Sequence, residues 1–185
     1  KGKIVSTGGL KPGDEIVMTK WAGLEGTSII AAEKEEKLLE TLPRELVDVA
    51  KGFKEYLSVI PESKIAMEVG VSAMHDVTEG GVFGALWELG EASGVGITAH
   101  LDKIPIKQET IEVCEVFKIN PYMLISSGSM MIGCEKGNLL VEKLEEAGIN
   151  AAVIGRATEG NDRIVVSRDE TRYIGPAGSD ELYKI

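Results

Sequence analysis

The sequence contains only two cysteines, Cys114 and Cys134, and their spacing matches neither a metal-binding motif nor a redox motif. Both lie in apolar, periodic segments, which indicates buried thiols. Reduced thiols without a disulfide framework are typical of a cytosolic protein. We therefore expect a cytoplasmic location.

Long hydrophobic runs and an excess of positive charge are also lacking. No apolar stretch approaches the roughly 20 residues that span a bilayer, and no signal-peptide pattern opens the chain. The formal net charge is −10 and there is no basic stripe, which disfavours binding to a nucleic-acid backbone or to an anionic membrane surface. We expect neither nucleic acid nor membrane among the partners.

The chain has no internal repeat and no low-complexity segment. Its 185 residues are enough to bury one sizeable hydrophobic core. The chain starts with Lys1 rather than Met, and its first ten residues, KGKIVSTGGL, are typical of a connecting segment. We therefore expect a linker over residues 1–10 and one folded domain over residues 11–185.

The hydrophobic pattern predicts helices that alternate irregularly with strands. Helices are expected over about 26–40, from Pro43 onward, from a Ser58 cap to about Met67, and over 82–93, 108–119 and 138–147. Strands are expected over 16–18, 71–74, 95–101 and 130–134, and the last two, 150–158 and 162–167, are expected to form an antiparallel hairpin. This order favours the α+β class over a regular parallel βαβ series.

The segment MHDVTEGG, residues 74–81, places Asp76, Thr78 and Glu79 just before two glycines and an apolar helix. One interpretation is that Asp76 or Thr78 caps this helix, an interaction worth about 1 kcal/mol. The other is that the strand end and the helix N-terminus border a cleft. There the carboxylates would suit Mg²⁺ or a polar substrate, and backbone N–H groups would suit an anion. Both interpretations remain open.

Three further features have an ordinary and a functional interpretation. The loop SSGSMM, residues 126–131, is either a phosphate-binding loop or a turn around Gly128. His75 either transfers a proton or orients Asp76, or it is structural. The sequence cannot place an acidic or nucleophilic side chain beside His100, which favours a structural role.

The segment AMHDVTEGGVFGALWELGEASGVGI, residues 73–97, resembles the signature of a known C-terminal domain. Aminoimidazole ribonucleotide (AIR) synthetase, selenophosphate synthetase, thiamine-monophosphate kinase and the hydrogenase maturation factor HypE share this domain. The resemblance continues in order through GGLKPGDEIVMTKWAGLEGTSIIA, CEVFKINPYMLISSGSMMIG and AAVIGRATEG, so it covers nearly the whole chain. It is strongest to HypE and its AIR-synthase-related homologues.

The resemblance implies an α+β fold with a mixed, mainly antiparallel sheet flanked by helices. In family members an N-terminal domain binds ATP and Mg²⁺ and forms most of a homodimer interface. Residues 1–10 would be the linker from that domain. Because the ATP-binding domain is not part of this sequence, we expect residues 11–185 alone to bind no cofactor and to have no activity. The family uses ATP to phosphorylate or dehydrate an amide, carbamoyl or similar oxygen. The implied partners are the N-terminal domain, a second full-length copy and a maturation partner protein.

For this chain, the resemblance implies one wall of the ATP-dependent cleft. The implied catalytic residues are Asp76, Thr78 and Glu79. The implied substrate-binding or phosphate-binding residues are Gly80, Gly81, Ser127, Gly128, Gly26 and Thr27. No metal ligand is expected within the chain itself.

Two departures from HypE leave the activity open. The HypE signature reads DPTRGG, whereas this chain has Val77 and Glu79 at the proline and arginine positions. HypE also ends in a cysteine that carries the carbamoyl group, and no cysteine lies near the final DELYKI. Three hypotheses therefore remain: the substrate-side half of an ATP-dependent enzyme, a non-catalytic binding or scaffold module, and a sensor of a phosphate ligand.

Overall fold

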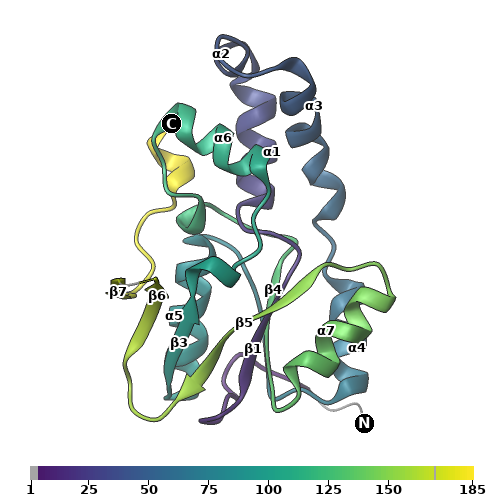
Figure 1. The fold of residues 1–185 in the computed structure, drawn as a ribbon, viewed down its shortest axis with the longest axis vertical. Coiled ribbons are helices and arrows are strands. Elements are labelled where there is room, and N and C mark those ends of the chain that lie inside the picture. The colour runs from purple at the N-terminus through teal and green to yellow at the C-terminus, as the bar shows by residue number, and fades with distance from the viewer. Residues whose placement is uncertain (1–3, 169) are drawn as a thin grey trace.

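The computed structural model describes residues 4–168 and 170–185. Its helices are α1 (Leu24–Glu33), α2 (Glu35–Leu39), α3 (Arg44–Gly52), α4 (Ile60–Val69), α5 (Gly81–Ser93), α6 (Gln108–Phe117) and α7 (Gly137–Glu146). Figure 1 shows α1, α2, α3 and α6 as a helical group above a sheet, with the other helices beside the sheet. Within the described part of the chain, no helix is both long and apolar enough to cross a membrane.

The strands form one mixed sheet in the order β2-β4-β1-β5-β3-β6-β7. Their bounds are β1 (Glu15–Thr19), β2 (Ala73–Asp76), β3 (Gly96–His100), β4 (Met130–Cys134), β5 (Ala151–Thr158), β6 (Arg163–Ser167) and β7 (Glu170–Tyr173). Neighbouring strands are antiparallel except for β3 and β6. The expected α+β class with a mainly antiparallel sheet is therefore confirmed.

The predicted hairpin between the last two predicted strands is wrong, because β3 lies between β5 and β6. The turn after β5 passes around the start of β3, where the Ile97 amide donates to the Asp162 carbonyl at 2.8 Å. A Cβ on Gly96 would collide with the Thr158 hydroxyl. Glycine thus allows the close approach that inserts β3. The turn residues between β5 and β6 indicate only that the chain reverses there. They do not indicate whether another strand lies between the two.

Three predicted boundaries also need correction. The strand expected over 71–74 covers Ala73–Asp76, because it pairs with Met130–Gly133 of β4. The helix expected over 26–40 is divided into α1 and α2 at Lys34. Val59 rather than Ser58 precedes α4, and no side chain caps that helix. Asp76 is consequently the last residue of a strand rather than part of a loop.

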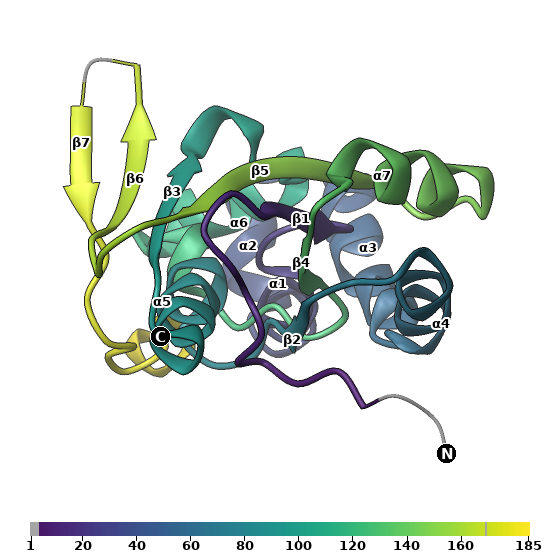
Figure 2. The same ribbon diagram turned by 90° about the horizontal axis from the view of Figure 1, so that it is seen from below.

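Helices cover both faces of the sheet. In β1, Ile16 and Met18 contribute to the core that α5 shares, whereas the intervening Val17 contributes to the core beneath α4 and α7. Alternate residues of a strand point to opposite faces, so α5 lies on one face and α4 and α7 on the other. Figure 2 shows this arrangement and shows β6 and β7 projecting beyond it. A third core joins α1, α2, α3 and α6.

The described part of the expected linker, residues 4–10, packs against β2 and α5. The Met74 amide donates to the Ser6 carbonyl, and the Leu10 amide donates to the Ser93 hydroxyl. Residues 1–3 lie outside the described residues. His75 joins this segment to α5, with Nδ1 3.2 Å from the Thr7 hydroxyl and Nε2 2.8 Å from Glu88 Oε2. These contacts support the structural interpretation of His75.

Both cysteines are buried, as expected. Burial raises the pKa of the Cys114 thiol to about 12, with a further contribution from the Glu181 carboxylate. Burial likewise raises the pKa of Cys134 to about 11. The thiolate, which is the reactive form, is therefore scarce at neutral pH.

We expect neither thiol to react with a water-soluble disulfide reagent at about pH 8 while the chain is folded. Unfolding in urea should return each pKa toward 9.0 and release both thiols. The measurement is absorbance of the released chromophore before and after urea is added. Rapid reaction of the folded chain would show that at least one cysteine is accessible.

Candidate functional site

Three of the predicted segments meet at one end of the sheet. Strand β4 lies between β1 and β2 and is antiparallel to both, so the ends of β1 and β2 flank the start of β4. Asp76 at the end of β2 is in register with Met130, and the Met130 amide donates to the Thr19 hydroxyl of β1 at 3.0 Å. The start of α1, the signature loop and the Ser/Gly loop therefore lie near each other.

The signature loop, residues 76–81, does not use its polar side chains to cap α5. The residue before α5 is Gly80, in a left-handed conformation with φ 79°, and α5 has no side-chain cap from its N-cap residue. The Gly81 amide donates instead to the Thr78 carbonyl at 3.1 Å. The capping interpretation of Asp76 and Thr78 is therefore wrong.

The two signature glycines are required by close packing. A Cβ on Gly81, which has φ 61°, would lie 2.7 Å from the carbonyl oxygens of Tyr122 and Leu124. A Cβ on Gly80 would lie 2.8 Å from the Ala177 methyl group. The left-handed conformation and these neighbours both exclude larger residues. The paired glycines thus bring the start of α5 against residues 122–124.

Gly26 packs at the other side of residues 122–129, whereas the neighbouring Thr27 contacts α6. The Gly26 amide donates to the Ile125 carbonyl at 3.0 Å, and a Cβ on Gly26 would collide with the Leu124 side chain. The Thr27 hydroxyl is fully buried and donates to the Thr110 hydroxyl of α6 at 3.0 Å. The Thr27 side chain therefore faces the helical group.

The serines of the Ser/Gly loop differ in what they bind. The Ser126 hydroxyl accepts from the Gly23 amide at 2.7 Å, and the Ser129 hydroxyl donates to the Trp21 carbonyl at 2.8 Å. Both side chains hold the loop against the end of β1. The Ser127 side chain is half-buried and makes no hydrogen bond to any described residue. Of the three, Ser127 is the one whose hydroxyl is not used by the fold.

Asp76, Thr78 and Ser127 share this lack of structural partners. Within residues 4–168 and 170–185, none of these side chains forms a hydrogen bond or an ion pair, and the Asp76 side chain is exposed. The same residues contain no group of three His, Cys, Asp or Glu side chains placed to hold a metal ion. Mg²⁺ usually takes one or two protein carboxylates together with substrate phosphates and water. Asp76 could supply one such ligand, but the described residues by themselves do not complete a metal site.

No local pattern in the sequence indicates the C-terminal residues that reach this loop. Asp180 is 2% exposed and accepts from the Gly80 amide at 2.8 Å and from the Leu182 amide at 2.9 Å. The Tyr183 hydroxyl donates to Glu79 Oε1 at 2.7 Å, and this hydrogen bond raises the pKa of Tyr183. Glu79 and the Gly80 amide are thus engaged within the chain. These contacts join residues about 100 positions apart, which local patterns cannot show.

Glu25 is another residue without a sequence signal. It lies in the first turn of α1, and its Oε2 is buried with no hydrogen-bond partner among the described residues. A glutamate in the first turn of a helix is ordinary, because it interacts favourably with the helix dipole. Only the tertiary structure distinguishes Glu25 from such a residue.

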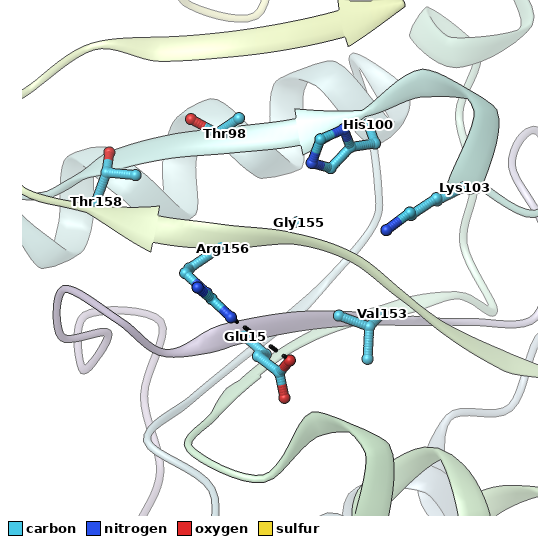
Figure 3. Close-up of a pocket in the computed structure, with 8 residues that line it drawn as sticks. All are labelled: Glu15, Thr98, His100, Lys103, Val153, Gly155, Arg156 and Thr158. Atoms are coloured by element: carbon cyan, nitrogen blue, oxygen red, sulfur yellow. Dashed lines mark ion pairs between the residues drawn. The ribbon is translucent and has the colours of Figure 1, made fainter.

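The hollows in the surface lie largely away from the predicted residues. A cavity of about 380 Å³ on the sheet is lined by residues of β1, β3 and β5, including Glu15, His100 and Arg156. Figure 3 shows Arg156 directed toward Glu15, and their ion pair spans 3.9 Å. A second hollow, of about 260 Å³, borders Gly80 and the segment 172–177. Of the predicted site residues, Gly80 alone lines one of these two hollows, and the Asp76 side chain is exposed.

Comparison with known proteins identifies the family. Residues 11–167 match the family described as AIR synthase related protein, C-terminal domain. The chain belongs to this family. The AIR synthase related domain includes all nine predicted site residues, whereas Asp180 and Tyr183 lie beyond the matched region.

Relatives of this AIR synthase related domain include hydrogenase maturation proteins. A protein of Methanocaldococcus jannaschii assigned to hydrogenase expression and formation is 30% identical over 175 residues, covering 90% of this chain and 48% of that protein. The carbamoyl dehydratase HypE of Rhodobacter capsulatus is 23% identical over 160 residues, covering 84% of this chain and 45% of HypE. The chain thus spans about half the length of these relatives.

A solved structure shares the fold. The hydrogenase maturation protein HypE in complex with ATP superposes with a TM-score of 0.74 at 16% identity, covering 96% of this chain and 55% of that one. At this identity the similarity concerns the fold alone. The expected fold and the resemblance to HypE are confirmed.

Removal of the Asp180 carboxylate should destabilise the chain. Asp180→Ala leaves two backbone N–H groups without their acceptor, which should cost about 2 kcal/mol. Urea unfolding would measure this cost, and limited proteolysis should show faster cleavage within residues 175–185. Asp102→Ala, at an exposed carboxylate without a partner among the described residues, is the matched control and should change stability by less than about 0.5 kcal/mol. Equal effects of the two variants would contradict a structural role for Asp180.

Proposed function

We propose that this chain forms the substrate-side wall of an ATP-dependent site in a HypE-like, AIR-synthase-related protein. The observation that carries the proposal is the meeting of three separate segments at one end of the sheet. There Asp76, Thr78 and Ser127 have polar side chains without partners among the described residues. A fold that needed these groups for stability would give them hydrogen bonds. Their position is consistent with groups kept for a ligand.

The proposed reaction is ATP-driven phosphorylation or dehydration of an amide-type or carbamoyl-type oxygen. Thr78 and Ser127 can each donate one hydrogen bond to a phosphoryl or carbonyl oxygen. Asp76 can accept a proton or bind Mg²⁺, which would offset its repulsion of the ATP phosphates. The carbamoyl dehydratase HypE relative supports this substrate class, and the ATP complex of a HypE structure supports the nucleotide.

ATP and Mg²⁺ would be bound mainly by a second domain. The described residues of this chain contain no set of three metal ligands, and the relatives extend to about twice its length. The remainder of such a protein would supply the other metal ligands and most of a homodimer interface. A maturation protein is a further proposed partner.

A non-catalytic binding or scaffold module is the second candidate. It is favoured by the contacts of Asp180 and Tyr183, which engage the Gly80 amide and the Glu79 carboxylate from within the chain. Because these two groups already form hydrogen bonds within the chain, the loop has fewer hydrogen-bonding groups left for a substrate. ATP turnover by the full-length protein distinguishes the two candidates.

The first test is Asp76→Asn in the full-length protein. The change removes a negative charge with little change in size, and Asp76 makes no hydrogen bond or ion pair with the described residues. We expect ATP turnover to fall by roughly 100-fold while the melting temperature stays within about 1 °C.

The matched control is Asp48→Asn, on the exposed side of α3 and likewise without a described partner. It should leave both turnover and melting temperature unchanged. If Asp76→Asn behaves like Asp48→Asn, Asp76 has no part in the reaction. If the unaltered full-length protein shows no turnover with any amide or carbamoyl substrate, the scaffold candidate is preferred.

The second test concerns the chain by itself. We expect residues 1–185 to fold and to show no ATP turnover, with Mg-ATP dissociating at roughly millimolar concentration or above, because one wall of a site provides few contacts. Isothermal titration calorimetry and a phosphate-release assay would measure this. Micromolar affinity for Mg-ATP would show that the chain holds the nucleotide without another domain.

A further inference from the structure

Lys20 has a backbone conformation that is unfavourable for lysine. It follows β1 directly and has φ 52°, in the left-handed region. Glycine adopts this region readily, whereas a residue with a Cβ is strained there. Strained residues persist where the surrounding structure compensates for the strain. The Lys20 side chain should therefore make interactions that glycine could not.

The Lys20 ammonium is surrounded by oxygen atoms. Nζ donates to the carbonyl oxygens of Tyr56 at 2.8 Å, Ser58 at 2.7 Å and Gly128 at 2.9 Å. It also lies 2.5 Å from Glu62 Oε1. An ammonium has three protons, and the three carbonyls account for all of them. Glu62 therefore contributes mainly its negative charge, which agrees with the absence of a well-directed hydrogen bond to it.

These contacts are buried and connect distant parts of the chain. Lys20 is 8% exposed and Glu62 is 0% exposed. Gly128 belongs to the Ser/Gly loop and has φ 102°, and a Cβ on it would lie 2.6 Å from the Tyr56 carbonyl oxygen. The ammonium thus draws the loop, the segment 56–58 and α4 to the end of β1. A buried charge of this kind is strongly destabilising when its partner is removed.

We propose that Lys20 is the positioning residue of the Ser127–Gly128 loop, and that its four surrounding oxygens form a monovalent-cation site occupied by the tethered ammonium. Backbone carbonyls bind K⁺ in other proteins, and one carboxylate balances one positive charge. Arginine would not replace lysine here, because its planar guanidinium spreads its donors over a fixed fork. The inference concerns the conformation of the loop and holds whatever ligand the loop binds.

The test is Lys20→Gly, which removes the ammonium and relieves the strained backbone. We expect the melting temperature to fall by roughly 10 °C despite that relief. Ammonium or potassium chloride should then raise it by about 4 °C relative to tetramethylammonium chloride at equal concentration, as for a ligand at roughly ten times its dissociation constant. In NMR spectra, the Ser127 and Gly128 amide signals should shift in Lys20→Gly and return toward their original positions with ammonium.

The matched control is Lys118→Gly. Lys118 also has a left-handed conformation, φ 55°, but it is exposed at the end of α6 and its ammonium has no partner among the described residues. This variant should lose no stability, because glycine is favoured at such a helix end, and it should show no preference between the two kinds of cation. The double variant Lys20→Gly with Glu62→Gln should also lose the ammonium effect, because the negative charge is gone.

Two results would overturn the proposal. One is a Lys20→Gly chain whose response to ammonium equals that of Lys118→Gly. The other is a Lys20→Gly chain that remains unfolded in ammonium chloride, since the four oxygens would then not accept a free cation. Unchanged Ser127 and Gly128 signals in a folded Lys20→Gly chain would contradict the positioning role specifically.

Discussion

The packing of residues 122–129 against the starts of two helices is the constraint on which the candidate site depends. Leu124 is fully buried against Gly26 of α1, while the carbonyls of Tyr122 and Leu124 approach Gly81 of α5 too closely for any side chain there. A larger residue at either glycine would separate a helix start from this segment. The glycines at positions 26 and 81 are therefore explained by packing alone, and any contact with a ligand is additional.

The charged side chains fall into two kinds: those that bind other groups of the fold, and those that have no partner among the described residues. The chain carries a net charge of −10, and two of its buried charges have several partners: Lys20 with three carbonyls and Glu62, and Asp180 with two backbone amides. Burying a charge without such partners would be costly. Asp76 is exposed and has no partner within the described residues. Asp76 is therefore a candidate site residue because its carboxylate makes no contact among the described residues that stabilises the fold, and not merely because it is an aspartate.

The family, the fold class and most elements could be predicted, because they rest on local patterns and on collinear motifs. The helix over 82–93 follows from its apolar stripe and its terminal glycine, and α5 covers Gly81–Ser93. The pairing of β5 and β6 could not be predicted, since β3 enters between them from an earlier part of the chain. The local spacing allows capping by Asp76 or Thr78, but Gly80 occupies the N-cap position and its amide donates to Asp180.

The sequence by itself determined which segments carry polar groups beside glycines, because residue type and spacing are fully local properties. Only the tertiary structure decided which of those groups remain available. Among the serines of one loop, Ser126 and Ser129 are bound to residues about 100 positions earlier, whereas Ser127 makes no such bond with the described residues. Lys20 and Asp180 carry no local signal at all. Their partners are distant in sequence, and hydrogen bonding between distant residues exists only once the chain has folded.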